Sequence, residues 1–157
     1  MTVRGAVKIP VVGAGIATYH LVYQLARNFA VVSINEQLNP AFIRAMKATG
    51  CYDRMTSMRA IRKPLKDPME KLPYTREELE KEIVRIASKQ IKNEEAQLIV
   101  LGCAIFSLFL KPGARERLGK KLGVIVVDPQ EIAIKTAEML VNLKLTHSKM
   151  EYPQMEF

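Results

Sequence analysis

Cysteine and histidine are scarce in this 157-residue chain, which contains two of each. Cys51 and Cys103 are too few for a disulfide framework, and neither has a CxxC partner. His20 and His147 are too few and too scattered to suggest a zinc cluster. These absences argue against a disulfide-stapled protein and a zinc-binding module, and they favour reduced thiols in a cytoplasmic protein.

Long apolar runs are also absent. No segment reaches the roughly 18 apolar residues that are needed to span a bilayer. Residues 1–8 lack the apolar centre of a secretion signal. We therefore expect a cytoplasmic location and no membrane partner.

Positive charge is in excess, but the aromatic residues that often accompany it in nucleic-acid-binding proteins are few. The formal net charge is +8, and aromatic residues make up 6% of the chain. Cations gather at residues 59–66 and 111–121, with no aromatic residue among them. Such a charge raises nucleic acid as a partner. Without stacking side chains, we interpret the charge as solvated surface and expect no nucleic-acid partner.

Short apolar segments alternate with amphipathic helical patterns along the chain, as in βα units around a parallel sheet. Hydrophobic residues make up 48% of the sequence, and its length suits one compact domain. The sequence therefore predicts an α/β fold, a three-layer parallel sheet of about four strands flanked by helices, in a single domain over residues 1–157. Strands are expected near residues 29–34, 58–64, 96–101 and 124–127, and helices near residues 17–27, 40–50, 76–91, 114–122 and 129–143.

Several local predictions accompany this pattern. Thr75 and Glu78 have the spacing of a capping box, which predicts the start of a helix. Residues 66–74 are rich in proline and are expected to form a loop. Residues from Thr146 onward show no period and are interpreted as a tail in which His147 is solvated. Leu21, Val22 and Leu25 of the first helix are expected to face inward. The last helix carries apolar residues at a helical spacing: Ile132, Ala137, Leu140 and Leu143.

Cys103 is the strongest candidate functional residue, because it lies where an apolar strand ends. In parallel α/β sheets, ligands bind just beyond the carboxyl ends of strands. A thiol there can act as a nucleophile or as an acid or base, and Gly102 before it would let a ligand approach the backbone. The alternative is that Cys103 only fills space, as buried cysteines often do. Ser33 also ends a strand, where it would bind a substrate oxygen or, equally, the local backbone.

Three other motifs have simpler interpretations. Residues 13–15 read Gly-Ala-Gly before a helix, but Thr18 stands where a dinucleotide loop has its third glycine. We interpret this segment as a tight turn. Asp128, followed by proline, fits a helix cap better than a catalytic acid, and Cys51 is expected to be structural.

Several segments together resemble the aspartate/glutamate/hydantoin racemase superfamily, and most closely its hydantoin and allantoin racemase branch. Their order spans nearly the whole chain. The more specific part is the strand end Leu-Gly-Cys-Ala followed by Leu-Gly-Val and Asp-Pro. The matching segments are residues 9–15, 29–33, 59–61, 96–104, 122–129 and 146–149.

The resemblance implies racemisation of a carbon next to a carbonyl, without metal or cofactor. In this family two cysteines, one from each of two α/β lobes, transfer protons on opposite faces of the substrate. Cys103 matches the second of them, which makes it the implied catalytic residue. The resemblance places Ser33, Gly102, Ala104 and Ile105 around the substrate, with Ile105 narrowing the pocket where the family has a small residue.

The resemblance also indicates what the chain does not match. The family's first cysteine lies upstream of the segment that corresponds to residues 9–12, and Cys51 is not at that position. We therefore expect the chain to correspond to the second lobe plus the C-terminal helix and tail, without most of the first lobe.

Two hypotheses follow. The first is a hydantoin-racemase-like enzyme in which Cys103 transfers a proton on a hydantoin or amino-acid derivative. A single thiol would support one-sided transfer, as in the related arylmalonate decarboxylases. The second is a catalytically inert or oligomer-forming truncated homologue with no racemase activity. Under either hypothesis a homo-oligomer is expected, because apolar surface left uncovered favours association.

Overall fold

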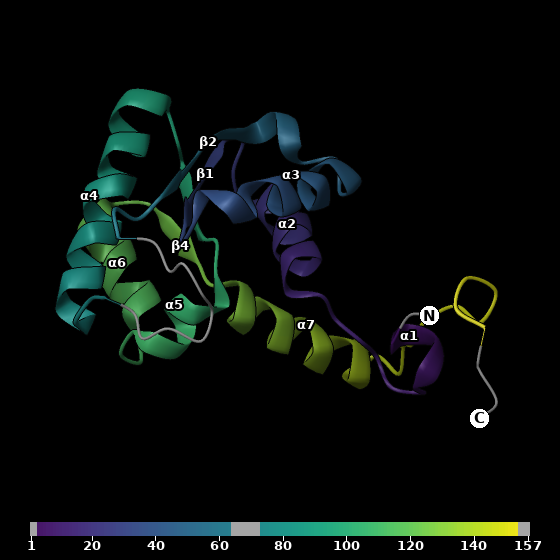
Figure 1. The fold of residues 1–157 in the computed structure, drawn as a ribbon. Helices are drawn as coiled ribbons and strands as arrows, with labels where there is room; N and C mark the ends of the chain where they lie inside the picture. Colours follow the sequence, from purple (N-terminus) through teal and green to yellow (C-terminus); the bar gives the residue numbers. More distant parts are fainter. Residues whose placement is uncertain (1–2, 64–72, 154–157) are drawn as a thin grey trace.

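A sheet of four parallel strands lies at the centre of the computed structural model, which describes residues 3–63 and 73–153. The strands follow the order β2-β1-β3-β4, so the chain moves outward from β1 to β2 and then returns to the other side of β1 (Figure 1). The strand bounds are β1 Phe29–Ser33, β2 Met55–Ala60, β3 Leu98–Leu101 and β4 Ile125–Val127.

Helices cover both faces of this sheet, which confirms the predicted three-layer α/β fold. Helices α4 and α6 lie on one side, and α2 and α3 on the other (Figure 1). The helix bounds are α1 Val3–Ala6, α2 Ala14–Leu25, α3 Asn39–Ala48, α4 Arg76–Glu94, α5 Ala104–Phe109, α6 Ala114–Leu122 and α7 Pro129–Asn142, with 3₁₀ turns η1 Glu36–Leu38 and η2 Tyr52–Arg54.

The two central strands are apolar on both faces because each face meets a helical layer. Every residue of β1 and of β3 is buried. Alternate side chains of β1 point to opposite layers: Val32 packs in the cluster with Leu79 of α4, whereas Val31 packs in the cluster with Val22 of α2. The sheet is therefore the boundary between two apolar cores.

The start and the inner face of α4 agree with the sequence. The Thr75 hydroxyl accepts a hydrogen bond from the Glu78 backbone N–H at 3.2 Å, and the Glu78 carboxylate accepts one from the Thr75 N–H at 2.7 Å. This confirms the predicted capping box. The helix buries Leu79, Ile83 and Ile86 against the sheet.

The second strand is shifted from its predicted position. The sequence predicts it near residues 58–64, but β2 spans Met55–Ala60. Its bounds are set by pairing with β1, where Phe29 lies opposite Met55 and Ser33 opposite Ala60. Because β2 is an edge strand whose residues are half-buried or exposed, it lacks a clear apolar pattern. Most of the predicted loop at residues 66–74 lies outside the described residues.

The predicted inner face of the first helix is partly wrong, and the apolar residues of the last helix are not buried. Helix α7 extends away from the sheet alongside α2 (Figure 1), and none of its residues is buried. Leu143, which follows α7, is 59% exposed. In α2, Val22 is fully buried as expected, but Leu25 is 42% exposed. Helical periodicity identified residues that share a face, but little in the described part of the chain covers the far face of α7.

Residues 146–153, the last that the structure describes, are not a free tail. They lie beside the N-terminal segment (Figure 1), where the Val11 backbone N–H donates to Nε2 of His147 at 2.7 Å. The Arg4 guanidinium donates to the Tyr152 hydroxyl at 3.0 Å, and the His147 and Tyr152 rings meet edge to face. His147 therefore joins the two ends of the described chain, contrary to the prediction that it is solvated.

Candidate functional site

Cys103 lies where the order of the strands in the sheet reverses. The chain leaves β1 toward β2 on one side and returns to β3 on the other, so the carboxyl ends of β1 and β3 form a topological switch point. Cys103 follows β3 by two residues and is the N-cap residue of α5. Ser33 is the last residue of the neighbouring strand β1, which pairs with β3 through Val32 and Leu101. The structure therefore brings Cys103 and Ser33 to the same end of the sheet, where the carboxyl ends of the strands lie.

Gly102 is a point of close approach between β1 and β3. A Cβ atom at this position would lie 2.6 Å from Cγ1 of Val31 and 3.1 Å from the backbone oxygen of Val32. The Gly102 N–H also donates to that oxygen at 2.8 Å. Gly102 is therefore required for packing against β1, whereas the sequence led us to expect space for a ligand beside it.

Ser33 is fully buried, and its side chain is engaged with the local backbone. Its hydroxyl donates to the backbone oxygen of Asn35 at 2.8 Å and accepts from the Asn35 N–H at 3.2 Å. This is the second of the two interpretations that the sequence left open. In this conformation Ser33 shapes the loop after β1, and its hydroxyl is not directed at a ligand.

The Cys103 thiol is half-buried. Burial raises its pKa above the ordinary value for cysteine, and the backbone N–H of Ile105 partly offsets this by favouring the thiolate. Ala104 and Ile105 are also half-buried, while Phe106 is fully buried in the core. The N-cap residue of α5 thus presents a partly accessible thiol, and at neutral pH that thiol is mostly protonated.

Cys51 is far from this site. Cys51 precedes β2, whereas Cys103 follows β3. In a parallel sheet the two cysteines therefore lie at opposite ends of the strands. The strands between them separate the two thiols by about 20 Å along the strand direction. Cys51 is fully buried, with its sulfur 3.4 Å from the Thr49 hydroxyl. The two described cysteines do not act on one substrate molecule within this chain.

Ser107 and Asp128 are two further polar residues near the candidate site. The Ser107 hydroxyl of α5 donates to Oδ1 of Asp128 at 2.5 Å. The same carboxylate oxygen accepts the Gln130 N–H at 2.9 Å, which confirms Asp128 as the N-cap residue of α7. The capping role was readable from the sequence. The contact with Ser107, 21 residues away, left no signal in it.

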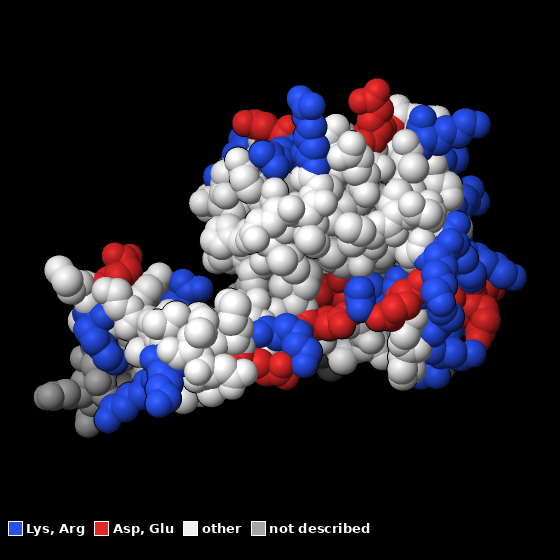
Figure 2. Space-filling model, turned by 180° about the vertical axis from the view of Figure 1, so that it is seen from behind, with Lys and Arg blue, Asp and Glu red and all other residues white. Residues whose placement is uncertain are grey.

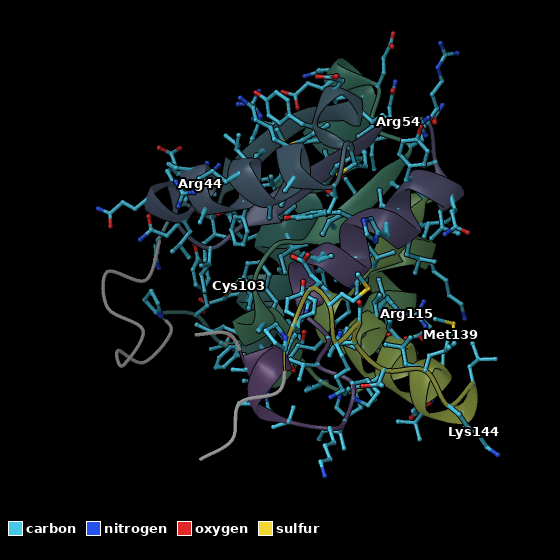
Figure 3. The ribbon with its side chains drawn as sticks, turned by 90° about the vertical axis from the view of Figure 1, so that its right-hand side faces the viewer. Arg44, Arg54, Cys103, Arg115, Met139 and Lys144 are labelled. Carbon is cyan, nitrogen blue, oxygen red and sulfur yellow. The ribbon has the colours of Figure 1, made fainter. Side chains whose placement is uncertain are left out.

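Two cavities adjoin this contact. One of about 620 Å³ lies between α2 and α7, and another of about 370 Å³ lies beside Ser107; Arg115, Asp128 and Glu131 line both. Cys103 lines neither of them. Figure 3 shows Cys103 well apart from Arg115 and Met139, which belong to the larger cavity. The candidate thiol is therefore on a different part of the surface from the larger hollow.

The structure offers no metal site or membrane span in the part of the chain that it describes. Within residues 3–63 and 73–153, no three His, Cys, Asp or Glu side chains are grouped so as to hold a metal ion. No helix in these ranges is long and apolar enough to cross a bilayer.

Comparisons with known proteins agree with the fold. The family model described as Asp/Glu/Hydantoin racemase matches residues 1–137. A hydantoin racemase from Paenarthrobacter aurescens is 33% identical over 148 residues, which are 89% of this chain and 56% of that protein. A hydantoin racemase from Pseudomonas sp. strain NS671 is 29% identical over 150 residues, 92% of this chain and 56% of its own.

A solved structure is similar over nearly the whole chain. The crystal structure of allantoin racemase from Pseudomonas fluorescens superposes with a TM-score of 0.79 at 28% sequence identity, covering 98% of this chain and 62% of its own. The chain thus spans a little over half the length of the relatives it matches. The family model covers most of the chain, residues 1–137, and is sufficient to assign it: the chain belongs to the Asp/Glu/hydantoin racemase family.

Proposed function

We propose that this protein transfers a proton at the carbon next to a carbonyl in a hydantoin or related amino-acid derivative, and that Cys103 is the group that transfers it. The observation that carries the proposal is the position of the Cys103 thiol, half-buried at the switch point between β1 and β3, in a chain of the racemase family. The similarity to hydantoin and allantoin racemases suggests the substrate class.

The chemistry requires the thiol in both protonation states. As thiolate, Cys103 removes the proton from the carbon, which leaves the electron pair delocalised onto the adjacent carbonyl as an enolate and the sulfur as S–H. As thiol, it returns a proton to that carbon and becomes thiolate again. Burial favours the thiol, and the Ile105 N–H favours the thiolate. A group held between these influences suits general acid–base catalysis. The residues of the described site supply this step without a metal ion or cofactor.

A single thiol acts from one face of the substrate. Cys51 lies at the opposite end of the strands, so Cys103 is the one cysteine of the described residues at this site. A proton removed and returned on the same face leaves the configuration of the carbon unchanged. We therefore propose that the 157-residue chain alone catalyses exchange of the proton more readily than inversion.

The experiment is isotope exchange in D₂O with an enantiopure 5-substituted hydantoin. We expect deuterium at C5, measured by NMR, to exceed that in protein-free buffer. Optical rotation should fall more slowly than the deuterium content rises, because the single thiol works on one face. Uptake no faster than in buffer would contradict the proposed activity. Rotation falling in step with deuterium uptake would contradict one-sided transfer.

A second role, association between copies of this chain, is favoured by the outer surface of α7. No residue of this helix is buried, and Ile134 and Val141 are 59% and 60% exposed. These two residues line a hollow with Ala137 on the same helix. Figure 2 shows the face of the molecule that is turned away in Figure 1. A broad area of it is largely free of charged side chains, above a band of mixed acidic and basic residues. We propose that a homo-oligomer covers α7 and this face.

A charge placed on α7 tests this role. We expect the unmodified protein to sediment at a mass above its 17.7 kDa monomer and Val141→Asp to shift it toward the monomer, because the carboxylate must be desolvated in the interface. Lys89→Asp, at an exposed position of α4, is the matched control and should leave the mass unchanged. An unmodified protein that sediments as a 17.7 kDa monomer at every concentration would refute the homo-oligomer.

A further inference from the structure

The helix that carries Cys103 is too short to hold itself in place. Helix α5 has six residues, and isolated helices shorter than about 12 residues are marginal in water. Its N-cap residue, Cys103, makes no side-chain capping hydrogen bond, and its first turn contains no acidic residue. The orientation of the thiol must therefore come from contacts that α5 makes with the rest of the fold.

One side of α5 is fixed by the core. Phe106 is fully buried and Leu110, at the end of the helix, is 6% exposed; both belong to the apolar cluster that packs against α4 and α6. Apolar packing holds the helix against the sheet but resists rotation about the helix axis only weakly, since it is not directional. A directional contact on another side of the helix is needed to fix that rotation.

The hydrogen bond between Ser107 and Asp128 is such a contact. It is 2.5 Å long and charge-assisted, which places it among the stronger kinds of hydrogen bond. Asp128 itself is held firmly: it follows β4, whose Val127 pairs with Val100 of β3, and its carboxylate caps α7. Ser107 is in the first turn of α5, and Cys103 is the residue from which that turn starts, so a rotation of the helix also turns the backbone that carries the thiol.

We propose that Ser107, held by Asp128, is a positioning residue for Cys103: the hydrogen bond fixes the rotation of α5 and thereby the direction in which the thiol faces. The chain of contacts runs from β3 and β4 through Asp128 and Ser107 to the first turn of α5. The catalytic consequence of this positioning rests on the proposed function. The positioning itself is a property of the folded chain and is tested without a substrate.

The test compares Ser107→Ala, Ser107→Thr and the matched control Ser88→Ala, which removes a hydroxyl from an exposed position of α4. Cys103 is alkylated with iodoacetamide over a pH series, and peptide mass spectrometry separates its rate from that of the buried Cys51. Ser107→Ala should shift the rate-versus-pH profile of Cys103, because turning the thiol changes its burial, which is the main cause of its raised pKa. We expect a shift of about half a pH unit or more, which changes the alkylation rate at a fixed pH by about threefold or more. Ser107→Thr, which keeps the hydroxyl, should restore the original profile.

A cycle with Asp128→Ser examines the partner. Serine is a good N-cap residue, so this change keeps the cap of α7 but is too short to reach Ser107. In that background Ser107→Ala should have no further effect on Cys103 alkylation. A Ser107→Ala profile that superimposes on that of the unmodified protein, or an equal effect in both backgrounds, would overturn the proposal.

Isotope exchange separates this inference from the proposed function. If the unmodified protein exchanges the C5 proton of a hydantoin, Ser107→Ala should lower the turnover rate by about tenfold or more with little change in KM, since a small misplacement of a catalytic group has a large cost. If the unmodified protein shows no exchange, the proposed activity fails. The alkylation profiles then still decide whether Ser107 positions the thiol.

Discussion

Replacing Gly102 with alanine is expected to destabilise the fold by about 2–3 kcal/mol, the upper part of the range for overpacking a core. The added Cβ would lie 2.6 Å from Cγ1 of Val31 and 3.1 Å from the backbone oxygen of Val32. The Val31 side chain, on β1, is fully buried between the sheet and the α2 layer, so it has no free space into which it could move. The remaining response is to separate β1 from β3, which lengthens the 2.8 Å hydrogen bond from Gly102 to Val32. Urea unfolding monitored by circular dichroism measures the loss.

Gly15→Ala is the matched control for this change. Gly15 lies in the first turn of α2, where the nearest atom to an added Cβ is Cε2 of Tyr19 at 3.6 Å, an ordinary van der Waals distance. Because alanine favours a helix over glycine, this variant should be neutral or more stable by up to about 1 kcal/mol. Equal unfolding midpoints for Gly102→Ala and the unmodified protein would contradict the close approach of β1 and β3.

The central part of the fold was predictable because strands that are buried on both faces appear in the sequence as continuous apolar segments. The residues of β1 and β3 form continuous apolar runs, and each is covered by a helical layer on either side. The ends of α4 and α6 were predictable for local reasons. The Thr75 cap and Gly123, whose φ of 69° suits glycine, act through atoms close in sequence.

The edges of the fold were less predictable because they depend on distant partners. The bounds of β2 follow from its register with β1, and its own residues show no strong period. Leu143 and Leu25 continue helical patterns, but a pattern cannot show whether another element covers it. The contact of His147 with Val11 joins residues 136 positions apart, and no local pattern indicates it.

The candidate site divides in the same way. The position of Cys103 followed from one local fact, that an apolar strand ends just before it. The roles of Gly102 and Ser33 depended on how close β1 lies to β3 and on how the loop after β1 turns. The contact of Ser107 with Asp128 required the fold itself, because it connects two helices that follow different strands. The sequence can therefore identify the candidate thiol without identifying what orients it.

Replacing Cys103 with serine is expected to lower the catalysed deuterium uptake by a hydantoin by at least about 10²-fold, the lower bound for loss of a general acid–base group. Serine has nearly the same shape, so the fold should be kept. Its hydroxyl is far too weak an acid to form the anion that removes the proton, whereas a thiol reaches this state at accessible pH. NMR of the hydantoin in D₂O, corrected for exchange in protein-free buffer, gives the rate.

The pH dependence and a second cysteine variant make this prediction specific to the site. Because burial raises the pKa of Cys103, its thiolate is a minor species at neutral pH. The catalysed rate should therefore increase as pH rises toward that pKa, and Cys103→Ser should abolish the increase. Cys51→Ala is the matched control: Cys51 is buried at the opposite end of the strands, so this variant should keep both the rate and its pH dependence. Exchange that persists in Cys103→Ser, or that is lost in a folded Cys51→Ala protein, would show that the reactive thiol is not Cys103.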